Sequence, residues 1–230
     1  MSGTLYVVAT PIGNLEDITM RAVRVLGEVD LVACEDTRHS GKLLSHFGIS
    51  ASLIAYHEHN EAARSSQLVE ALEEGRSVAL ISDAGTPGIS DPGYRLIRAC
   101  RQAGVSVQAV PGVSAVVAAL SVSGLSVVRF AFEGFLPAKR NARCSYLERV
   151  SGDERTLVFY EAPHRLVAML EDIIGIMGAE REVVVARELT KLHEETVTGA
   201  AAEVLEQFSS RPRVRGELVV MVAPARPKGP

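Results

Sequence analysis

The sequence predicts an α/β protein made of two α/β domains. In the first half of the 230-residue chain, short apolar strands alternate with helical segments, a pattern typical of a parallel sheet with helices on both faces. In the second half some strands follow one another without a helix between them, which indicates a mixed sheet with helices. Gly124 to Arg129 interrupts the alternation. We therefore expect an N-terminal domain over 1–124 with a mostly parallel five-stranded sheet, and a C-terminal mixed-sheet domain over 125–230.

Composition excludes several classes of protein. Three cysteines without CxxC or Cys/His ligand spacing predict neither a disulfide framework nor a zinc site. The first ten residues lack the basic and apolar regions of a signal peptide, and no apolar run approaches the ~18 residues of a membrane span. A net charge of -4 argues against general nucleic-acid coating but allows a local basic patch. We expect a cytoplasmic protein without a membrane partner.

The N-terminal domain contains five apolar segments that read as strands, each followed by a segment with helical spacing. The expected strands are residues 5–10, 29–34, 52–56, 78–81 and 105–110, and the expected helices are 17–26, 40–47, 62–73, 94–101 and 114–120. Parallel strands end at the same edge of a sheet, where ligands bind in such folds. The loops that follow the strands are therefore the first place to look for a site.

The loop from Ser82 to Asp91 follows the central strand and consists largely of Asp, Gly, Pro and Ser. Gly85 and Gly88 allow close approach of backbone to a ligand, and Asp83 and Asp91 offer carboxylates to hydroxyls or to a cation. No lysine follows the glycines, so the loop is not a phosphate cradle. The alternative is a purely structural turn.

Two other strand ends are polar. Glu35 to His39 follows the second strand, where Asp36 could act in the cleft or cap the next helix. HEHNE at 57–61 follows the third strand, but two histidines without a third fixed ligand are a weak metal signal. We predict no metal site. The first loop, ATPIGN at 9–14, also lacks the GxGxxG pattern of dinucleotide folds.

In the C-terminal domain the expected strands are 130–135, 156–160, 183–186, 195–199 and 217–222, with helices at 166–177 and 201–207. Residues 136–143 read as a cation-rich loop, which is an RNA patch or a solvated charged loop. The phenylalanines at 130, 132 and 135 fit one buried strand face better than a stacking platform. ARPKGP at 225–230 reads as a frayed tail.

Several motifs in order closely resemble the ribosomal RNA small-subunit methyltransferase I family, over residues 5–222. They are PIGNLEDIT (11–19), ACEDTR (33–38), YHEHNE (56–61), LISDAGTPGISDPG (80–93), PGVSA (111–115), GFLPAKRNAR (134–143), YEAPHR (160–165) and RELTKLHEE (187–195). The resemblance implies a tetrapyrrole-methylase-like fold that binds S-adenosylmethionine between two α/β domains. It also implies 2'-O-methylation of a cytidine ribose in the decoding region of 16S ribosomal RNA, within the small subunit, by a homodimer.

The resemblance also implies site residues. Cofactor contacts are expected at Pro11, Asp83, Ala84, Gly85, Ile89, Ser90, Ser114, Ala115, Tyr160, Leu189 and Gly216. Candidate proton acceptors are Asp36, Glu161 and His164, with a desolvated Lys139 as the alternative. Arg187 and Lys191 would stabilise the developing alkoxide or a phosphate. The candidate RNA-binding cations are Arg38, Lys139, Arg140, Arg143 and Arg165.

Each of these assignments has a structural alternative, which is a helix cap for Asp36, an ion pair for Glu161 with Arg165, and a hydrogen-bonded turn for His164. Two other functions stay open as well. A tetrapyrrole methyltransferase would bind its substrate without the basic loop. A non-enzymatic RNA-binding module would not need the Gly/Asp/Pro cleft and would not bind S-adenosylmethionine.

Overall fold

A computed structural model describes residues 2–225 and divides the chain into two compact units, Met1–Ser114 and Ala115–Pro230. The division falls before the boundary expected at 124/125, because α5 (Ala115–Val122) packs against β10 (Leu218–Val222) of the second unit. Most of the expected tail lies outside the described residues. None of the helices within 2–225 is long and apolar enough to cross a membrane.

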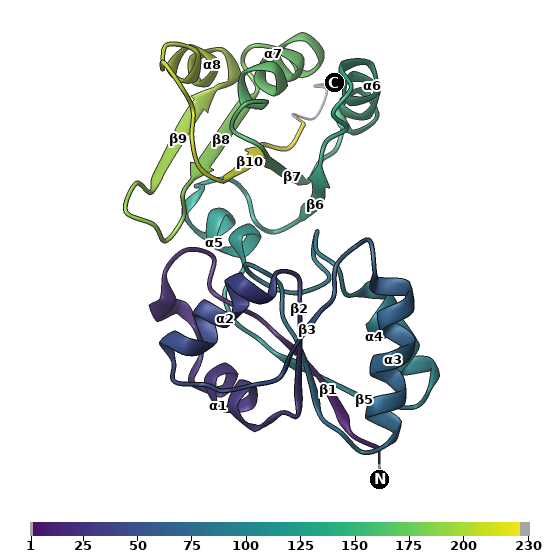
Figure 1. The fold of residues 1–230 in the computed structure, drawn as a ribbon. Helices are drawn as coiled ribbons and strands as arrows, with labels where there is room; N and C mark the ends of the chain where they lie inside the picture. Colours follow the sequence, from purple (N-terminus) through teal and green to yellow (C-terminus); the bar gives the residue numbers. More distant parts are fainter. Residues whose placement is uncertain (1, 226–230) are drawn as a thin grey trace. The chain divides into compact units, whose positions relative to one another are not determined.

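Unit 1 is built on the expected five-stranded parallel sheet (Figure 1). Its strands lie in the order β3-β2-β4-β1-β5, with the bounds Leu53–Ala55, Leu31–Cys34, Val78–Leu80, Thr4–Val8 and Ser106–Val110. Leu5 of β1 pairs with Val78 on one side and Val107 on the other, so β1 is a central strand. From β1 the chain moves to β2 in one direction, and from β4 it moves to β5 in the other. The strand order therefore reverses between β1 and β4, which is where ligands bind in open parallel sheets.

Helices cover both faces of this sheet, as the apolar strands require. α1 (Met20–Glu28) and α2 (Thr37–His46) cover one face, while α3 (Glu61–Glu73) and α4 (Tyr94–Gln102) cover the other (Figure 1). The helix expected from residue 17 begins at Met20, because the Thr19 hydroxyl accepts from the Ala22 N–H at 3.0 Å as an N-cap. Leu15–Asp17 forms a separate 3-10 turn before it.

Unit 2 is built on the expected mixed sheet. Its strands lie in the order β6-β7-β10-β8-β9, with the bounds Phe130–Phe135, Thr156–Glu161, Leu218–Val222, Glu182–Arg187 and Glu195–Ala200. β6 and β7 are parallel, whereas β10 is antiparallel to β7 and β8, and β8 is antiparallel to β9. The β8–β9 hairpin confirms the pairing expected from the sequence.

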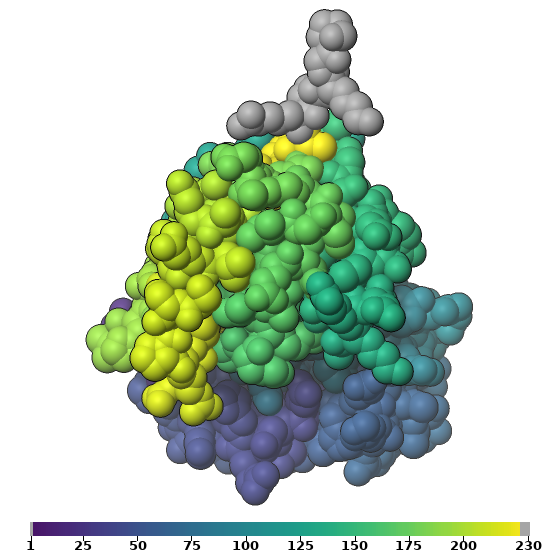
Figure 2. Space-filling model, turned by 90° about the horizontal axis from the view of Figure 1, so that it is seen from above, coloured from purple at the N-terminus to yellow at the C-terminus, as the bar shows by residue number. Residues whose placement is uncertain are grey.

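Three helices lie side by side over one face of this sheet, and α5 lies on the other (Figure 1, Figure 2). They are α6 (Arg140–Val150), α7 (Leu166–Met177) and α8 (Ala201–Ser209). Helix α6 is not predicted by the sequence pattern, which reads its first residues as a loop. It is the crossover that the parallel β6–β7 pair requires, and its Leu147 enters the core beside Phe159 and Met169.

Candidate active site

The first and central loops of unit 1 are joined at the β1–β4 switch point. Thr10 and Gly85 exchange backbone hydrogen bonds of 2.8 and 3.0 Å, and the Thr10 hydroxyl donates to the Ser82 carbonyl at 3.1 Å. Gly85 has a φ of +77°, which favours glycine there. These contacts fix the two loops to each other directly after the strands end.

The structure places most residues predicted to contact a cofactor at this edge of unit 1. Ser114 closes the turn after β5, whose Gly112 lies so close to β1 that an added Cβ would come within 2.9 Å of the Ala9 Cβ. Ala115 begins α5 in unit 2. The residues that follow β1, β4 and β5 are Pro11, Asp83, Ala84, Gly85, Ile89, Ser90 and Ser114.

Three carboxylates beside this edge repel one another. Burial, together with the charges of Glu35 and Asp83, raises the pKa of Asp91 to about 6 against a hydrogen bond from Ser82. Burial and the charge of Asp83 also raise the pKa of Glu35. A site with this charge favours a cationic ligand with hydroxyl and amino groups. S-adenosylmethionine, with its sulfonium, ammonium and ribose hydroxyls, fits such negatively charged acceptors.

Asp36 acts as the helix cap that the sequence analysis gave as its alternative role. Its side chain accepts from the N–H groups of Arg38 at 2.8 Å and His39 at 3.4 Å at the start of α2. These hydrogen bonds lower the pKa of Asp36, which makes the carboxylate a weaker proton acceptor. Its own N–H donates to Asp83 at 3.3 Å, and so joins the end of β2 to the central loop.

HEHNE forms a turn at the start of α3. The His57 N–H donates to the Asn60 side chain at 2.9 Å, and the Asn60 amide lies 3.1 Å from His57 Nε2. The rings of His57 and His59 are 6.0 Å apart, edge to face. Among residues 2–225, no three His, Cys, Asp or Glu side chains are grouped so that they could hold a metal ion.

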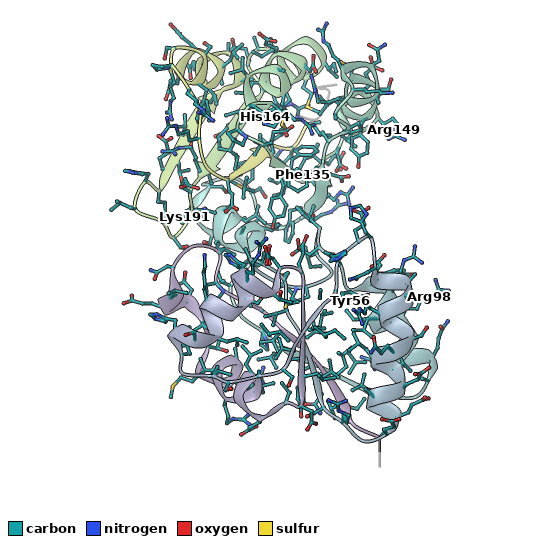
Figure 3. The ribbon with its side chains drawn as sticks, in the orientation of Figure 1. Tyr56, Arg98, Phe135, Arg149, His164 and Lys191 are labelled. Atoms are coloured by element: carbon teal, nitrogen blue, oxygen red, sulfur yellow. The ribbon has the colours of Figure 1, made fainter. Side chains whose placement is uncertain are left out.

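In unit 2 the loop between β8 and β9 is held by ion pairs. Lys191 Nζ donates to Glu188 at 2.9 Å and to Glu217 at 2.8 Å (Figure 3 labels Lys191). Burial alone would lower the pKa of Lys191, but these hydrogen bonds outweigh it and raise the pKa. At Gly216, with φ +91°, an added Cβ would lie 2.4 Å from the Glu188 side chain. Glycine there allows Glu188 to reach Lys191.

Arg187, the last residue of β8, is the second cation beside this loop, and it also forms an ion pair. Its guanidinium pairs with Glu195, which also binds Arg211, and it donates to the carbonyls of His193 at 3.0 Å and Arg215 at 3.1 Å. The described contacts of Arg187 and Lys191 therefore hold the loop. Leu189, a predicted cofactor contact, lies buried within it.

The end of β7 is a buried ionic turn. Glu161 Oε1 lies 3.2 Å from the Arg165 Nε and accepts from the Ala162 N–H at 2.7 Å, as the ion-pair alternative expected. Burial raises the pKa of Glu161 despite these contacts, and its Oε2 is buried without a hydrogen-bond partner among residues 2–225. Arg165 donates to the Leu136 and Pro137 carbonyls, and thereby ties this turn to the loop after β6. His164, which Figure 3 labels, is an exposed residue of this turn.

The structure corrects the RNA-binding prediction for Arg143. Its side chain is only 5% exposed and pairs with buried Asp172 of α7 at 2.6 Å. Arg140 binds the same carboxylate at 3.0 Å but remains 77% exposed, and Lys139 is exposed at the start of α6. Arg165 is also largely buried. The exposed candidates are therefore Lys139 and Arg140 in unit 2, and Arg38 in unit 1.

The expectation that the β6 phenylalanines form core is also wrong. Phe130 and Phe135 are 43% and 57% exposed. A bulge between Phe132 and Gly134 shifts the alternation by one residue, so Phe132 and Phe135 lie on the same side of the strand. The ring centroids of Phe132 and Phe135 lie 4.9 and 5.6 Å from that of Tyr160. This aromatic face opposes the core face that Ala131 shares with Phe159. Tyr160 is the predicted cofactor contact of β7.

Comparisons with known proteins agree with this architecture. The family model for tetrapyrrole (corrin/porphyrin) methylases matches residues 4–205. Uroporphyrin-III C-methyltransferase from Thermus thermophilus, solved with S-adenyl homocysteine, shares the fold at a TM-score of 0.66 and 20% identity, over 96% of this chain and 97% of that one. The methyltransferase CobJ has a TM-score of 0.71 at 20% identity, over 99% and 98%.

Curated relatives are much more similar in sequence. Proteins named ribosomal RNA small subunit methyltransferase I are 53% identical in Pasteurella multocida, over 96% of this chain and 79% of that protein, and 52% identical in Escherichia coli O157:H7, over 96% and 77%. Together with the two-sheet fold and the loops joined at the switch point, these matches show that the chain belongs to the ribosomal RNA small subunit methyltransferase I family of the tetrapyrrole methylases.

Proposed function

We propose that this protein uses S-adenosylmethionine to methylate the ribose 2'-hydroxyl of a cytidine in the decoding region of 16S ribosomal RNA. The observation that carries the proposal is the acidic edge of unit 1, where Thr10 and Gly85 join two loops beside Asp83 and Asp91. The names of relatives about half identical to this chain support ribosomal RNA of the small subunit as substrate.

S-adenosylmethionine, when bound, supplies an electrophilic methyl group on a positively charged sulfur. The chain's own part is to hold that charge beside carboxylates and to fix the acceptor in line. Glu35 and Asp91 provide the negative field in unit 1. Tyr160, Leu189 and Gly216 are the proposed contacts from unit 2. Positioning of this kind can lower a barrier by ~7 to 11 kcal/mol in the best cases.

The ribose hydroxyl must also lose its proton. Of the candidate groups, Asp36 caps a helix, and Glu161, Arg187 and Lys191 hold loops through ion pairs. Lys139 was the alternative only if desolvated, and it is exposed. We propose the exposed His164 as the group that takes the proton, worth about 10² to 10⁴ in rate.

Single-turnover methylation by folded His164→Ala and Lys139→Ala enzymes tests this assignment. Full rates in both variants would leave positioning as the whole of catalysis.

Lys139 and Arg140 are the proposed RNA contacts of unit 2, and Arg38 that of unit 1. The Lys139→Ala, Arg140→Ala double variant should weaken RNA binding and reduce the salt slope by about one unit for each lost phosphate contact. An unchanged slope would remove these residues from the proposal.

We propose that the protein works as a homodimer in the cytoplasm. Exposed apolar side chains in unit 2 support a protein contact there, and they are Val117, Val122, Val127, Val128 and Phe130. Light scattering behind a sizing column measures the mass directly, and a monomer at working concentration would refute the dimer.

The test of the reaction is transfer of labelled methyl to purified small subunits and, separately, to naked ribosomal RNA. Label in RNA supports the proposal, and the comparison shows whether the enzyme reads RNA alone or an assembled surface. Tight cofactor binding without label in either substrate would favour a small-molecule acceptor, as in tetrapyrrole methylation. Failure to bind S-adenosylmethionine would refute the enzyme.

A further inference from the structure

A groove of about 650 Å³ lies between α3 and α4 in unit 1, and the proposed reaction does not use it. Small side chains, among them Ala62 and Ala99, line it from both helices. Figure 3 shows Arg98 on the outer side of this pair. The polar residues that line the groove include Glu61, Ser66, Tyr94, Arg95, Arg98 and Gln102.

The two helices that form the groove are fixed to each other beneath it. The buried Tyr56 hydroxyl lies 3.1 Å from the Ser65 hydroxyl of α3 and accepts from the Leu96 N–H of α4 at 3.3 Å. Leu68 and Leu96 extend into the same core cluster below. The groove is therefore preformed, and a ligand would not have to order it.

The groove carries net positive charge. α4 contains three arginines and no acidic residue, and the one acidic residue that lines the groove, Glu61, already pairs with Arg95 at 2.6 Å. Neither Arg98 nor Arg101 forms an ion pair with another residue of the described chain 2–225. Arg98 donates to the Tyr94 hydroxyl at 3.2 Å, so its guanidinium is held beside a tyrosine ring that is 66% exposed.

We propose that this groove binds a segment of the RNA substrate away from the reacting ribose, with Arg98 on a phosphate and Tyr94 stacked on a base. A guanidinium matches the geometry of phosphate oxygens, and an exposed aromatic ring beside it suits unstacked bases of RNA. Ser66 and Gln102 offer hydrogen bonds to ribose hydroxyls. The inference rests on the proposed RNA substrate and adds a second contact surface to it.

Arg98→Gln removes the charge while keeping a polar side chain. In binding to purified small subunits across a range of salt concentrations, it should raise Kd about five-fold and reduce the salt slope by about one unit. The Kd for S-adenosylmethionine should stay as in the wild type, which shows that unit 1 is folded. Arg24→Gln is the matched control, because Arg24 is 59% exposed on α1, a helix of the other sheet face.

Tyr94→Ala should also raise Kd about five-fold or more but leave the salt slope unchanged, because stacking is not electrostatic. Tyr94→Phe keeps the ring and should bind close to the wild type. Equal Kd values and slopes for Arg98→Gln and Arg24→Gln, with Tyr94→Ala unchanged, would overturn the proposal.

A photo-crosslinking amino acid at Gln102 identifies what occupies the groove. Crosslinks to ribosomal RNA support the proposal, whereas crosslinks only to a protein of the subunit would overturn it in favour of a protein partner. The two proposals fail separately. If the wild type methylates RNA and the groove variants behave like Arg24→Gln, the groove assignment alone is wrong. If the wild type neither binds nor methylates RNA, the proposed function is wrong and this inference falls with it.

Discussion

Asp91 should make the protein less stable as the pH rises. Burial in the loop after β4, together with nearby carboxylates, raises its pKa from 3.8 to about 6. The folded state therefore binds this proton more tightly than the unfolded chain does. The resulting stability is complete below the unfolded pKa of 3.8 and is lost as the pH rises through about 6.

A difference of roughly two pKa units corresponds to about 3 kcal/mol in the free energy of unfolding, at ~1.4 kcal/mol per unit. When the pH rises from about 4.5 to about 8, the free energy of unfolding of Asp91→Asn should therefore increase by about 1 to 2 kcal/mol relative to that of the wild type. This range includes the screening by solvent. Urea unfolding of both proteins at the two pH values measures this change.

Asp153→Asn is the control, because hydrogen bonds from Arg155 hold the pKa of Asp153 at about 2. Asp153 is ionised in both the folded and the unfolded state across this pH range, so the effect of its replacement should not change with pH. The reasoning would be refuted if the difference in free energy of unfolding between Asp91→Asn and the wild type were also independent of pH.

Three further predictions concern stability, each measured by urea unfolding. Asp172→Ala leaves the buried Arg143 guanidinium without its 2.6 Å partner and should cost about 3 to 5 kcal/mol; a loss below about 1 kcal/mol would contradict the buried pair. Gly216→Ala forces a Cβ against Glu188 at positive φ and should cost about 1 to 3 kcal/mol, whereas an unchanged midpoint would show that the loop adapts freely. Tyr56→Phe removes two buried hydrogen bonds and should cost about 1 to 3 kcal/mol, and a neutral effect would mean that α3 and α4 do not depend on them.

The strands were predictable because the signal for each is local. The apolar run at 78–81, for example, ends at Ser82 and Asp83, and parallel pairing brings such ends to one edge. The Asp36 cap is local as well, since the two N–H groups that donate to its side chain lie two and three residues ahead. Every expected strand accordingly appears in the structure, with bounds that differ by at most a few residues.

Helix α6 could not be read from the apolar pattern because one of its buried positions is an arginine. Arg143 packs inward only because Asp172, 29 residues later, neutralises it. The signal that was available is Asp172, the one charged residue among the otherwise apolar buried positions of α7. A charged residue at a buried helix position predicts a charged partner elsewhere, but it does not say which one.

The β8–β9 loop shows a similar limit. Lys191 and Arg187 look like free cations in the sequence, whereas folding brings Glu217 and Arg211 to the same loop. The phenylalanines of β6 do share one face, because the bulge brings Phe135 to the side of Phe132. They were misassigned because the core lies against the opposite face, which carries Ala131. Such contacts depend on register and on distant segments, which local spacing does not encode.

The most direct test of the central claim is the position of the methyl group. RNA labelled by the enzyme should be treated with alkali and its products separated, because a methylated 2'-hydroxyl can no longer attack the neighbouring phosphate. The account predicts that the label stays in one alkali-resistant dinucleotide whose first residue is cytidine. Label released in single nucleotides would place the methyl group on a base and contradict the account.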